Sequence, residues 1–301
     1  MHLHVPTYAT IYCQGIITVG KLPTFAVAAR SLESAEKFAK THGIPKAYGS
    51  YQELVKDPNI DVLYIGVLHT HHLQVGLLFL NAGKNVLCEK PFAMNLREVR
   101  QLVSAARENN VFLMEAVWSR CFPVYAEVGR LLSESAVGQV KMVKVYFGLP
   151  LLDRERATQK EQGGGALMDI GIYCLQFALM VFKGERPESI HATGVLLPSG
   201  TVNITIALVT VHIHCVAHPM HCPTVLELNG KKTEFPLPEP GLPLNFHNST
   251  GLRYEAEEVR RCLLKGLKES IKMSLTDSEL LIEIMDEARR QVGVVYEQDS
   301  Q

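Results

Sequence analysis

The chain has 301 residues, and its 30 Lys and Arg against 31 Asp and Glu give a formal net charge of -1. This balance excludes a global field that would recruit nucleic acid or anionic lipid, so any anion site must be local. With 47% hydrophobic and 20% charged residues, the composition is that of a folded globular protein. No uninterrupted apolar run reaches the roughly 20 residues that span a bilayer. We therefore expect about two domains and neither a nucleic-acid nor a membrane partner.

The cysteines and the N-terminal residues bear on the compartment. The seven cysteines are odd in number and lack C-x-x-C spacing, which favours reduced thiols over a disulfide framework. The stretch MHLHVPTYATIYCQGIITVG has neither the charged start nor the continuous apolar segment of a signal peptide. These features predict a cytoplasmic protein.

From Phe25 onward, short apolar runs alternate with helical stretches. Continuous apolar runs that are separated by helices predict a parallel sheet covered on both faces, in a doubly wound α/β domain. Gly43 and Gly83 stand where helices should end, and Asn95 stands where one should begin. We assign residues 1–118 to this domain. The apolar runs are FAVAA (25–29), DVLYIGV (61–67), VLC (86–88) and VFLMEAV (111–117).

After Trp118 the pattern changes to strand runs that are followed by helices, which predicts a second, α+β domain over 119–301 with a mainly antiparallel sheet. The expected helices cover about 124–135, 165–182, 252–269 and 277–292, and the strand runs lie at 140–148 and between 189 and 237.

Several polar residues follow the predicted parallel strands directly. In a doubly wound sheet, ligands bind beyond the carboxyl ends of the strands. Arg30 stands where an NAD enzyme carries an acidic residue, and an arginine there suits a 2′-phosphate, although a solvated arginine opening a helix fits equally. His69 and His72 could contact a nucleotide or simply face water. The strand-end rule brings together Arg30, His69, His72, Glu89, Lys90 and Trp118.

The second domain contains EQGGGALMDIGIYCLQF (161–177), in which Asp169 and Tyr173 are four residues apart and share one helix face. If that face meets Lys90, the ammonium favours the phenolate and makes Tyr173 a usable acid/base. The alternative is an ordinary core helix with a tyrosine at its edge.

Four segments together, AVAAR, EKPFAMN, MEAVWSR and GGALMDIGIYCLQF, carry a resemblance. Over roughly 22–193 and 222–297, the chain resembles the glucose-fructose oxidoreductase/inositol dehydrogenase (Gfo/Idh/MocA) family, and most of all its branch that uses NADP to oxidise trans-dihydrodiols and D-xylose. The resemblance implies a Rossmann-like dinucleotide-binding domain, a homodimer, and hydride transfer from a carbinol of a cyclic trans-diol or of an aldose such as D-xylose. It makes Tyr173 and Lys90 catalytic. It assigns Arg30, His69, His72, Glu89 and Lys90 to the cofactor, and Trp118, Phe147 and Asp169 to the substrate.

The N-terminal residues depart from the family. Members begin with a strand and a Gly-rich turn whose amides meet the pyrophosphate. Here only Gly15 and Gly20 precede Arg30, and Pro6 lies in the segment available for the first strand. We expect weakened NADPH binding. The alternative function is a cofactor-impaired variant that folds or pairs with an intact subunit without catalysing a reaction.

A second departure is a sheet that is shortened near 195–222, the region through which relatives dimerise. In its place lies VHIHCVAHPMHC, with a cluster of histidines and cysteines whose density permits a zinc site. Its spacing matches no known finger, and a strand of alternating exposed histidines is the simpler interpretation, so we predict no metal. The cluster comprises His212, His214, Cys215, His218, His221 and Cys222.

Overall fold

The computed structural model describes residues 25–197, 200, 202–207, 215–218, 221–240 and 248–300. The predictions about the missing Gly-rich turn, about Pro6 and about His212 and His214 lie outside these residues. For 202–207 and 215–218 the backbone alone is described.

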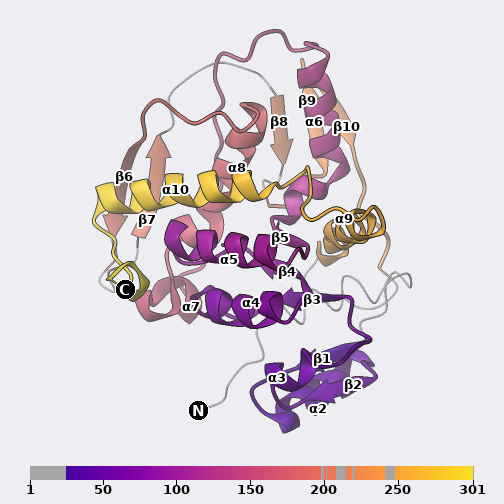
Figure 1. The fold of residues 1–301 in the computed structure, drawn as a ribbon. Coiled ribbons are helices and arrows are strands. Elements are labelled where there is room, and N and C mark those ends of the chain that lie inside the picture. The colour runs from indigo at the N-terminus through magenta and orange to yellow at the C-terminus, as the bar shows by residue number, and fades with distance from the viewer. Residues whose placement is uncertain are drawn as a thin grey trace.

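From Phe25 to Trp118, the described part of the N-terminal half contains five parallel strands in two sheets (Figure 1). One sheet pairs β1 with β2, and the other has the order β3-β4-β5. Helices connect the strands, which confirms the Rossmann-like α/β prediction. The elements are β1 (Ala26–Ala28), α2 (Leu32–His42), β2 (Lys46–Tyr48), α3 (Tyr51–Leu54), β3 (Val62–Ile65), α4 (His72–Asn81), β4 (Asn85–Glu89), α5 (Leu96–Glu108) and β5 (Leu113–Ala116).

Local chemistry sets the ends of these helices. The Asn95 side chain accepts a hydrogen bond from the Glu98 amide and begins α5. Gly43 ends α2 with a φ of 64°, a left-handed conformation that glycine adopts without steric cost. Both signals were visible in the sequence.

The C-terminal half combines helices with antiparallel strands, as predicted, but the strand expected at 140–148 does not form. Strand β6 pairs with β7, and β8, β9 and β10 form a three-stranded antiparallel sheet. A π-helical stretch, Leu167–Gly171, leads directly into α8. The elements are α6 (Pro123–Ser133), α7 (Glu155–Thr158), α8 (Ile172–Val181), β6 (His191–Leu196), β7 (Val202–Ala207), β8 (Cys215–His218), β9 (Val225–Leu228), β10 (Lys231–Glu234), α9 (Leu252–Leu264) and α10 (Leu275–Val292).

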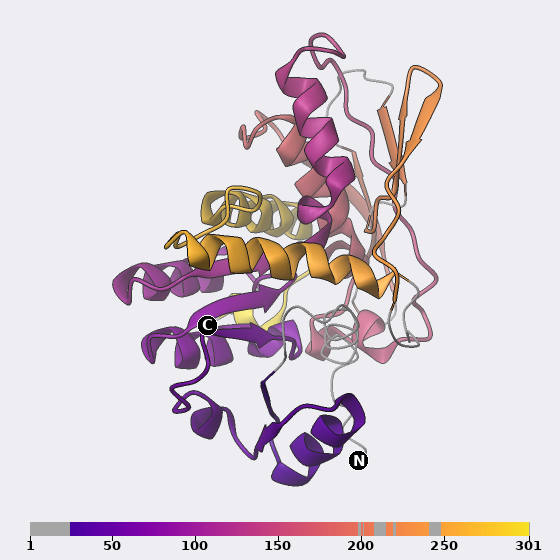
Figure 2. The ribbon, with the colours of Figure 1, turned by 90° about the vertical axis from the view of Figure 1, so that its right-hand side faces the viewer.

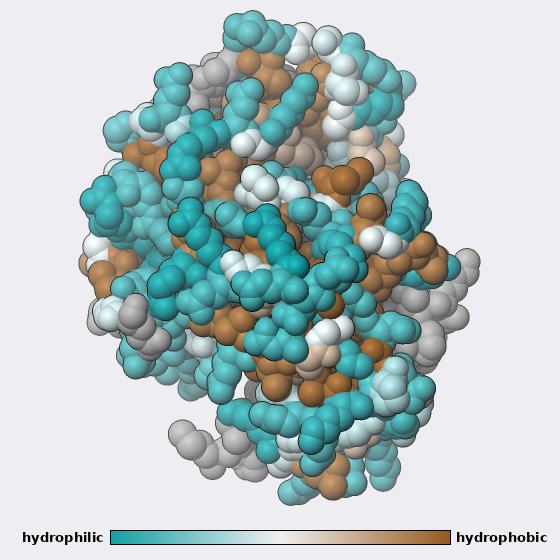
Figure 3. All heavy atoms as spheres, viewed as in Figure 1, coloured by the Kyte–Doolittle hydropathy of each residue, from teal (hydrophilic) through white to brown (hydrophobic). Residues whose placement is uncertain are grey.

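Helix α10 joins the two halves. It crosses the molecule above α5 and packs against α5, α8 and β6 (Figures 1 and 2). Its inner face buries Leu281, Ile284 and Met285, whereas the surface over α10 and α5 is largely hydrophilic (Figure 3). The burial of one apolar face against both halves therefore positions the N-terminal strands relative to α8.

One helical stretch has the length and composition of a membrane-spanning helix. Residues Lys160–Val181 contain an 18-residue window that is apolar enough to cross a membrane, by length and composition alone. In the structure, 72% of that window is buried inside the protein, as in the core helix of a water-soluble protein.

Candidate active site

Strand β4 carries two charged residues into the protein interior. Glu89 and Lys90 are each 7% exposed at its carboxyl end, where the Lys90–Pro91 peptide bond is cis. Glu89 Oε1 accepts a hydrogen bond from the Tyr64 hydroxyl at 2.7 Å, and Oε2 accepts one from the Lys90 amide at 3.1 Å. Buried polar groups need such partners, so the glutamate organises the corner on which the lysine stands.

The Lys90 ammonium bridges to the C-terminal half. Its Nζ donates to the backbone oxygen of Asp169 at 2.6 Å and lies 3.3 Å from Asp169 Oδ1. Arg156 donates to the same Oδ1 at 2.9 Å. Burial alone would raise the pKa of Asp169, but the charges and hydrogen bonds of Lys90 and Arg156 outweigh it and hold that pKa well below its usual range. A buried carboxylate is therefore kept ionised between two cations.

Tyr173 lies on the same side of the helix as Asp169. Lys90 Nζ is 5.2 Å from the centre of its ring, and the Trp118 indole Nε1 donates to its hydroxyl oxygen at 3.0 Å. The Phe147 and Tyr173 rings meet edge to face, with 5.8 Å between their centres. The structure thus brings Lys90, Trp118, Phe147, Asp169 and Tyr173 into one cluster, beyond the carboxyl ends of β4 and β5.

The two histidines that follow β3 make different contacts. His69 Nε2 donates to the Gly163 carbonyl at 2.9 Å and so touches the turn that precedes Asp169. His72 is 1% exposed and does not face water; its ring lies 3.1 Å from the Pro91 carbonyl and 3.0 Å from that of Val67. Burial lowers the pKa of both histidines to about 4, which leaves the rings neutral. The His72 ring packs between the loop after β4 and the end of β3, and a neutral ring with a single N–H donates to one side only. Contact of either histidine with a cofactor stays a prediction.

Arg30 stands apart from this cluster. It is exposed, directly after β1, and it has no ion pair within the part of the chain that the structure describes. Its assignment to a 2′-phosphate stays a prediction.

Two residues of the cluster, Arg156 and His221, were not predicted from the sequence. Arg156 lies in the short helix α7, in a polar stretch whose sequence gives no signal for a contact with Asp169. The sequence indicated His221 only as a possible metal ligand. In the structure its ring stacks on that of Phe147, with 5.2 Å between the ring centres, and its centre lies 6.2 Å from that of the Trp118 ring. Burial, and after it the charge of Lys90, lower the pKa of His221.

Behind Tyr173, a buried arginine fixes helix α8. Arg120 donates from Nε to Gln176 Oε1 at 2.6 Å and from a terminal nitrogen to the Gln176 carbonyl at 2.8 Å. Gln176 Nε2 donates in turn to the Tyr125 hydroxyl and to the Tyr173 carbonyl. The segment that carries Trp118 is thereby cross-linked to the helix that carries Tyr173.

The histidines and cysteines of 212–222 raise the question of a metal site. Among the residues that the structure describes, no group of three or more His, Cys, Asp or Glu could hold a metal ion. Cys222 is a buried free thiol. His212 and His214 lie outside the residues that the structure describes.

Comparison with known families gives two adjacent matches. A family model described as "Oxidoreductase family, NAD-binding Rossmann fold" matches residues 18–117, and the GFO/IDH/MocA C-terminal domain matches 125–218. Similar curated proteins are called trans-1,2-dihydrobenzene-1,2-diol dehydrogenase. The Danio rerio protein is 59% identical, over 92% of this chain and 90% of its own length. The Xenopus laevis protein is 52% identical, over 90% of each, and the Homo sapiens protein 44%, over 91% and 90%.

Solved structures share the fold at low sequence identity. Levoglucosan dehydrogenase in complex with NADH has a TM-score of 0.70 at 17% identity, over 95% of this chain and 94% of its own. A 3-ketoreductase from Actinomadura kijaniata in complex with NADP and TDP-benzene has a TM-score of 0.67 at 19% identity, over 93% of each chain. The resemblance inferred from the four sequence segments is therefore confirmed, and the chain belongs to the GFO/IDH/MocA family of oxidoreductases, with an NAD-binding Rossmann fold followed by that family's C-terminal domain.

Proposed function

We propose that the chain is an NADP-dependent dehydrogenase that oxidises a carbinol of a trans-dihydrodiol, or of an aldose such as D-xylose. The observation that carries the proposal is the buried Lys90 ammonium, which lies 5.2 Å from the centre of the Tyr173 ring while the Trp118 indole donates to the phenol oxygen. The names of the vertebrate relatives support a diol substrate.

Tyr173 is the proposed acid/base. Its phenol oxygen removes the proton of the substrate hydroxyl. A phenol with a reference pKa near 10 needs help for this at neutral pH. The ammonium of Lys90 and the indole N–H of Trp118 both stabilise negative charge on the ring and its oxygen, which favours the phenolate.

The residues on the Rossmann side suit an NADP molecule. Arg30 is exposed at the carboxyl end of β1, so its guanidinium can approach a 2′-phosphate. Lys90, with Glu89 orienting its backbone, would meet the nicotinamide ribose from the opposite end. His69 and His72 are assigned to the same side. When bound, the nicotinamide accepts the hydride from the carbinol carbon.

The substrate would lie against the aromatic side chains. Trp118 and Phe147 supply flat apolar walls, which suit the ring of a cyclic diol. Asp169 is an ionised acceptor beside them, and it would orient a substrate hydroxyl while Lys90 and Arg156 hold it in place.

The remaining assignments belong to the same proposal. We place the domain boundary between residues 118 and 119, which the spacing of the two family matches supports. We also propose a cytoplasmic homodimer that pairs through the second domain, if the shortened sheet near 195–222 permits it. The free thiols of Cys88, Cys121 and Cys262 agree with a reducing compartment.

The test of the proposed function is initial-rate kinetics on the purified chain with a trans-dihydrodiol and with D-xylose, each with NADP and with NAD. We expect turnover that depends on substrate and is faster with NADP at limiting cofactor. Preference for NAD, or oxidation of neither substrate, would contradict the proposal.

A second candidate function is a cofactor-impaired subunit that pairs without catalysis. It is favoured by the separation of the β1-β2 pair from the β3-β4-β5 sheet in the part of the chain that the structure describes. Titration with NADPH distinguishes the two functions, because the impaired subunit would show no saturable binding.

A further inference from the structure

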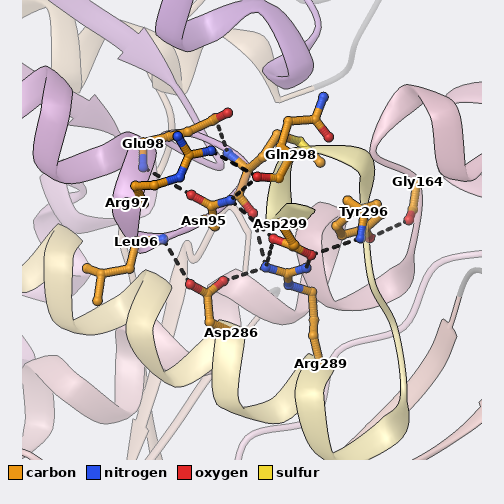
Figure 4. Close-up of polar contacts among 11 residues, drawn as sticks. Asn95, Leu96, Arg97, Glu98, Gly164, Asp286, Arg289, Tyr296, Gln298 and Asp299 are labelled. Carbon is orange, nitrogen blue, oxygen red and sulfur yellow. Dashed lines mark hydrogen bonds and ion pairs between the residues drawn. The ribbon is translucent and has the colours of Figure 1, made fainter. Parts of the chain in front are cut away.

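The segment after α10 returns to the turn that precedes the candidate acid/base helix. Tyr296 is 3% exposed, and its hydroxyl donates to the Gly164 carbonyl at 2.7 Å (Figure 4). Burial raises the pKa of Tyr296 to about 12, so the phenol is a neutral donor throughout the physiological range. A residue close to the C-terminus therefore contacts the loop that leads to Asp169 and Tyr173.

The turn Gly163–Gly165 has no side chains with which to fix itself. A Cβ at Gly163, where φ is 74°, would lie 2.1 Å from His69 Nε2, and a Cβ at Gly164 would lie 2.7 Å from the Gln159 carbonyl. The turn presents backbone carbonyls instead. Gly163 O accepts from His69, Gly164 O accepts from Tyr296, and Gly165 O accepts from the Asp169 amide at 3.1 Å. The Gly163 and Gly164 amides also donate to the Lys160 and Gln159 carbonyls, each at 2.9 Å, so the turn is bonded to the preceding residues, and the His69 and Tyr296 side chains add donors from outside the segment.

The segment that carries Tyr296 is itself anchored on the Rossmann side (Figure 4). Asp299 Oδ2 accepts from the Tyr296 amide at 2.8 Å and from Arg289 at 2.7 Å, and Asp299 Oδ1 accepts from Asn95 at 3.1 Å. Arg289 also donates to the Met94 carbonyl at 3.2 Å, and its guanidinium carbon lies 4.9 Å from the centre of the Tyr296 ring. Asn95 and Met94 belong to the loop that begins at Lys90.

These contacts span the two sides of the candidate active site. Lys90 lies at one end of the path, on the loop held by Arg289 and Asp299. Asp169 lies at the other end, directly after the turn held by Tyr296. The contact between Lys90 Nζ and the Asp169 carbonyl closes the path. We propose that Tyr296 is a positioning residue, which holds the Gly163–Gly165 turn so that Asp169 and Tyr173 stay in register with Lys90; the catalytic part of this inference rests on the proposed dehydrogenase function.

The test is Tyr296→Phe, which keeps the buried ring and removes only the donor to Gly164. We expect backbone amide hydrogen exchange across residues 166–171 to become about 10-fold faster, the effect of one net hydrogen bond. With the dehydrogenase substrate, kcat should fall by about 10-fold, while KM and the NADPH dissociation constant stay within about twofold. The deuterium isotope effect on kcat should rise, because misaligned chemistry becomes the slow step.

The matched control is Tyr254→Phe. The Tyr254 hydroxyl donates to the Pro236 carbonyl at a longer 3.5 Å, away from the glycine turn. This variant should change neither the exchange at 166–171 nor kcat.

A second variant tests the path rather than the phenol. Asp299→Ala leaves the Tyr296 hydroxyl in place but removes the acceptor for the Tyr296 amide. If both residues act through the same turn, the double variant should lose no more of kcat than about the larger of the two single losses. Fully multiplicative losses would overturn the inference, because they would show two independent effects.

The outcomes separate this inference from the proposed function. Unchanged exchange at 166–171 or an unchanged kcat in Tyr296→Phe overturns the inference, and so does a loss of kcat that accompanies faster exchange throughout the molecule. If the parent chain oxidises no substrate, the proposed function fails, and exchange alone decides whether Tyr296 holds the turn.

Discussion

Lys90 and Asp169 are charged residues in the interior, each 7% exposed, and they form an ion pair in which Arg156 is a second cation beside Asp169. Removing one partner of a buried pair leaves an uncompensated charge, which typically costs about 3–5 kcal/mol. Such a pair is weak evidence for stability, because apolar residues of the same volume often do as well. Its location beside Tyr173 and Trp118 therefore supports a functional role.

The first residue-scale prediction concerns proton transfer. Tyr173→Phe should lower kcat by about 10²–10⁴-fold, the usual contribution of a general acid/base, and leave the NADPH dissociation constant nearly unchanged. Lys90→Met should impair both quantities, because the ammonium serves the phenol and the cofactor. Steady-state kinetics and NADPH titration of the two variants check this. Near-parental turnover in Tyr173→Phe would remove the phenol from the mechanism.

The second residue-scale prediction concerns cofactor choice. Arg30→Ala should weaken NADP(H) much more than NAD(H), because only the former has a 2′-phosphate to lose a charge-assisted contact worth about 1.5–3 kcal/mol. The measurement is the pair of dissociation constants for parent and variant. Equal losses for the two cofactors would show that Arg30 serves the fold.

The residues of the candidate site differ in how far the sequence could predict them. Glu89, Lys90 and Trp118 follow parallel strands, so topology alone brings them to one edge. Asp169 and Tyr173 follow from helical spacing once their segment is assigned to a helix. Arg156 and His221 were not predictable as members of the cluster, because they reach it from the short helix α7 and from a turn, whose positions depend on tertiary packing. His72 shows the same limit: its position was predicted, but not that backbone carbonyls surround its ring.

At the level of elements, Glu115 links β5 to helix α10 and to the loop that follows β4. Its Oε1 accepts from the Phe92 amide, in the loop after β4, at 3.0 Å, and its Oε2 accepts from the Ser278 hydroxyl of α10 at 2.7 Å. Burial raises the pKa of Glu115 to about 7. The carboxyl that joins β5 to α10 therefore holds its proton more tightly in the native state than in the unfolded chain.

The sign of the resulting pH dependence follows from proton counting. Between about pH 4.5 and pH 7 the native state binds one more proton at Glu115 than the unfolded chain, so the free energy of unfolding falls as the pH rises. The contribution is fully present below about pH 4.5 and lost above about pH 7, and it amounts to roughly 3 kcal/mol.

The element-scale prediction is that Glu115→Gln, which mimics the protonated carboxyl, removes much of this dependence. Denaturant unfolding of parent and variant at about pH 5 and about pH 8 measures it. The variant should lose less stability than the parent between the two conditions. The control Glu234→Gln alters an exposed carboxyl on β10 and should retain the parental dependence. Equal losses in parent and Glu115→Gln would contradict the role of this carboxyl.

The elements themselves were largely predictable, for local reasons. Helix α2 ends at Gly43 and α5 begins at Asn95, the two caps predicted from the sequence, and the apolar runs form the parallel strands β1, β3, β4 and β5. The π-helical stretch Leu167–Gly171 was not predicted, because its hydrogen-bond register has no sequence signature. Such stretches occur often at functional sites, and this one contains Asp169, whose carbonyl accepts from Lys90.

At the scale of the whole molecule, α10 and the segment after it hold the Rossmann half against α8, while β1 and β2 form a sheet separate from β3-β4-β5 in the described part of the chain. Arg30 follows a strand of the smaller sheet, and Lys90 follows a strand of the larger one. A cofactor that contacts both residues must bridge the two sheets. The sequence indicated this difficulty, since 1–24 lack the Gly-rich turn that normally meets the pyrophosphate between them.

The prediction at this scale is that the chain binds NADPH more weakly than a family member with an intact Gly-rich turn, by several kcal/mol if about two or three charge-assisted hydrogen bonds to the pyrophosphate are lost. Calorimetric titration of both purified proteins under identical salt conditions compares them. A dissociation constant in the low micromolar range for this chain would contradict the expected loss.

The proposed function depends on whether Lys90 and Tyr173 form a working dehydrogenase centre in this chain. The most direct measurement is NADPH production by the purified protein at saturating NADP, with a trans-dihydrodiol and with D-xylose as substrates, beside the Tyr173→Phe variant at equal concentration. We expect NADP-dependent turnover of at least one substrate by the parent chain and a loss of about 10²-fold or more in the variant. Saturable NADPH binding without turnover of either substrate, or equal rates for the two proteins, would contradict the proposed function.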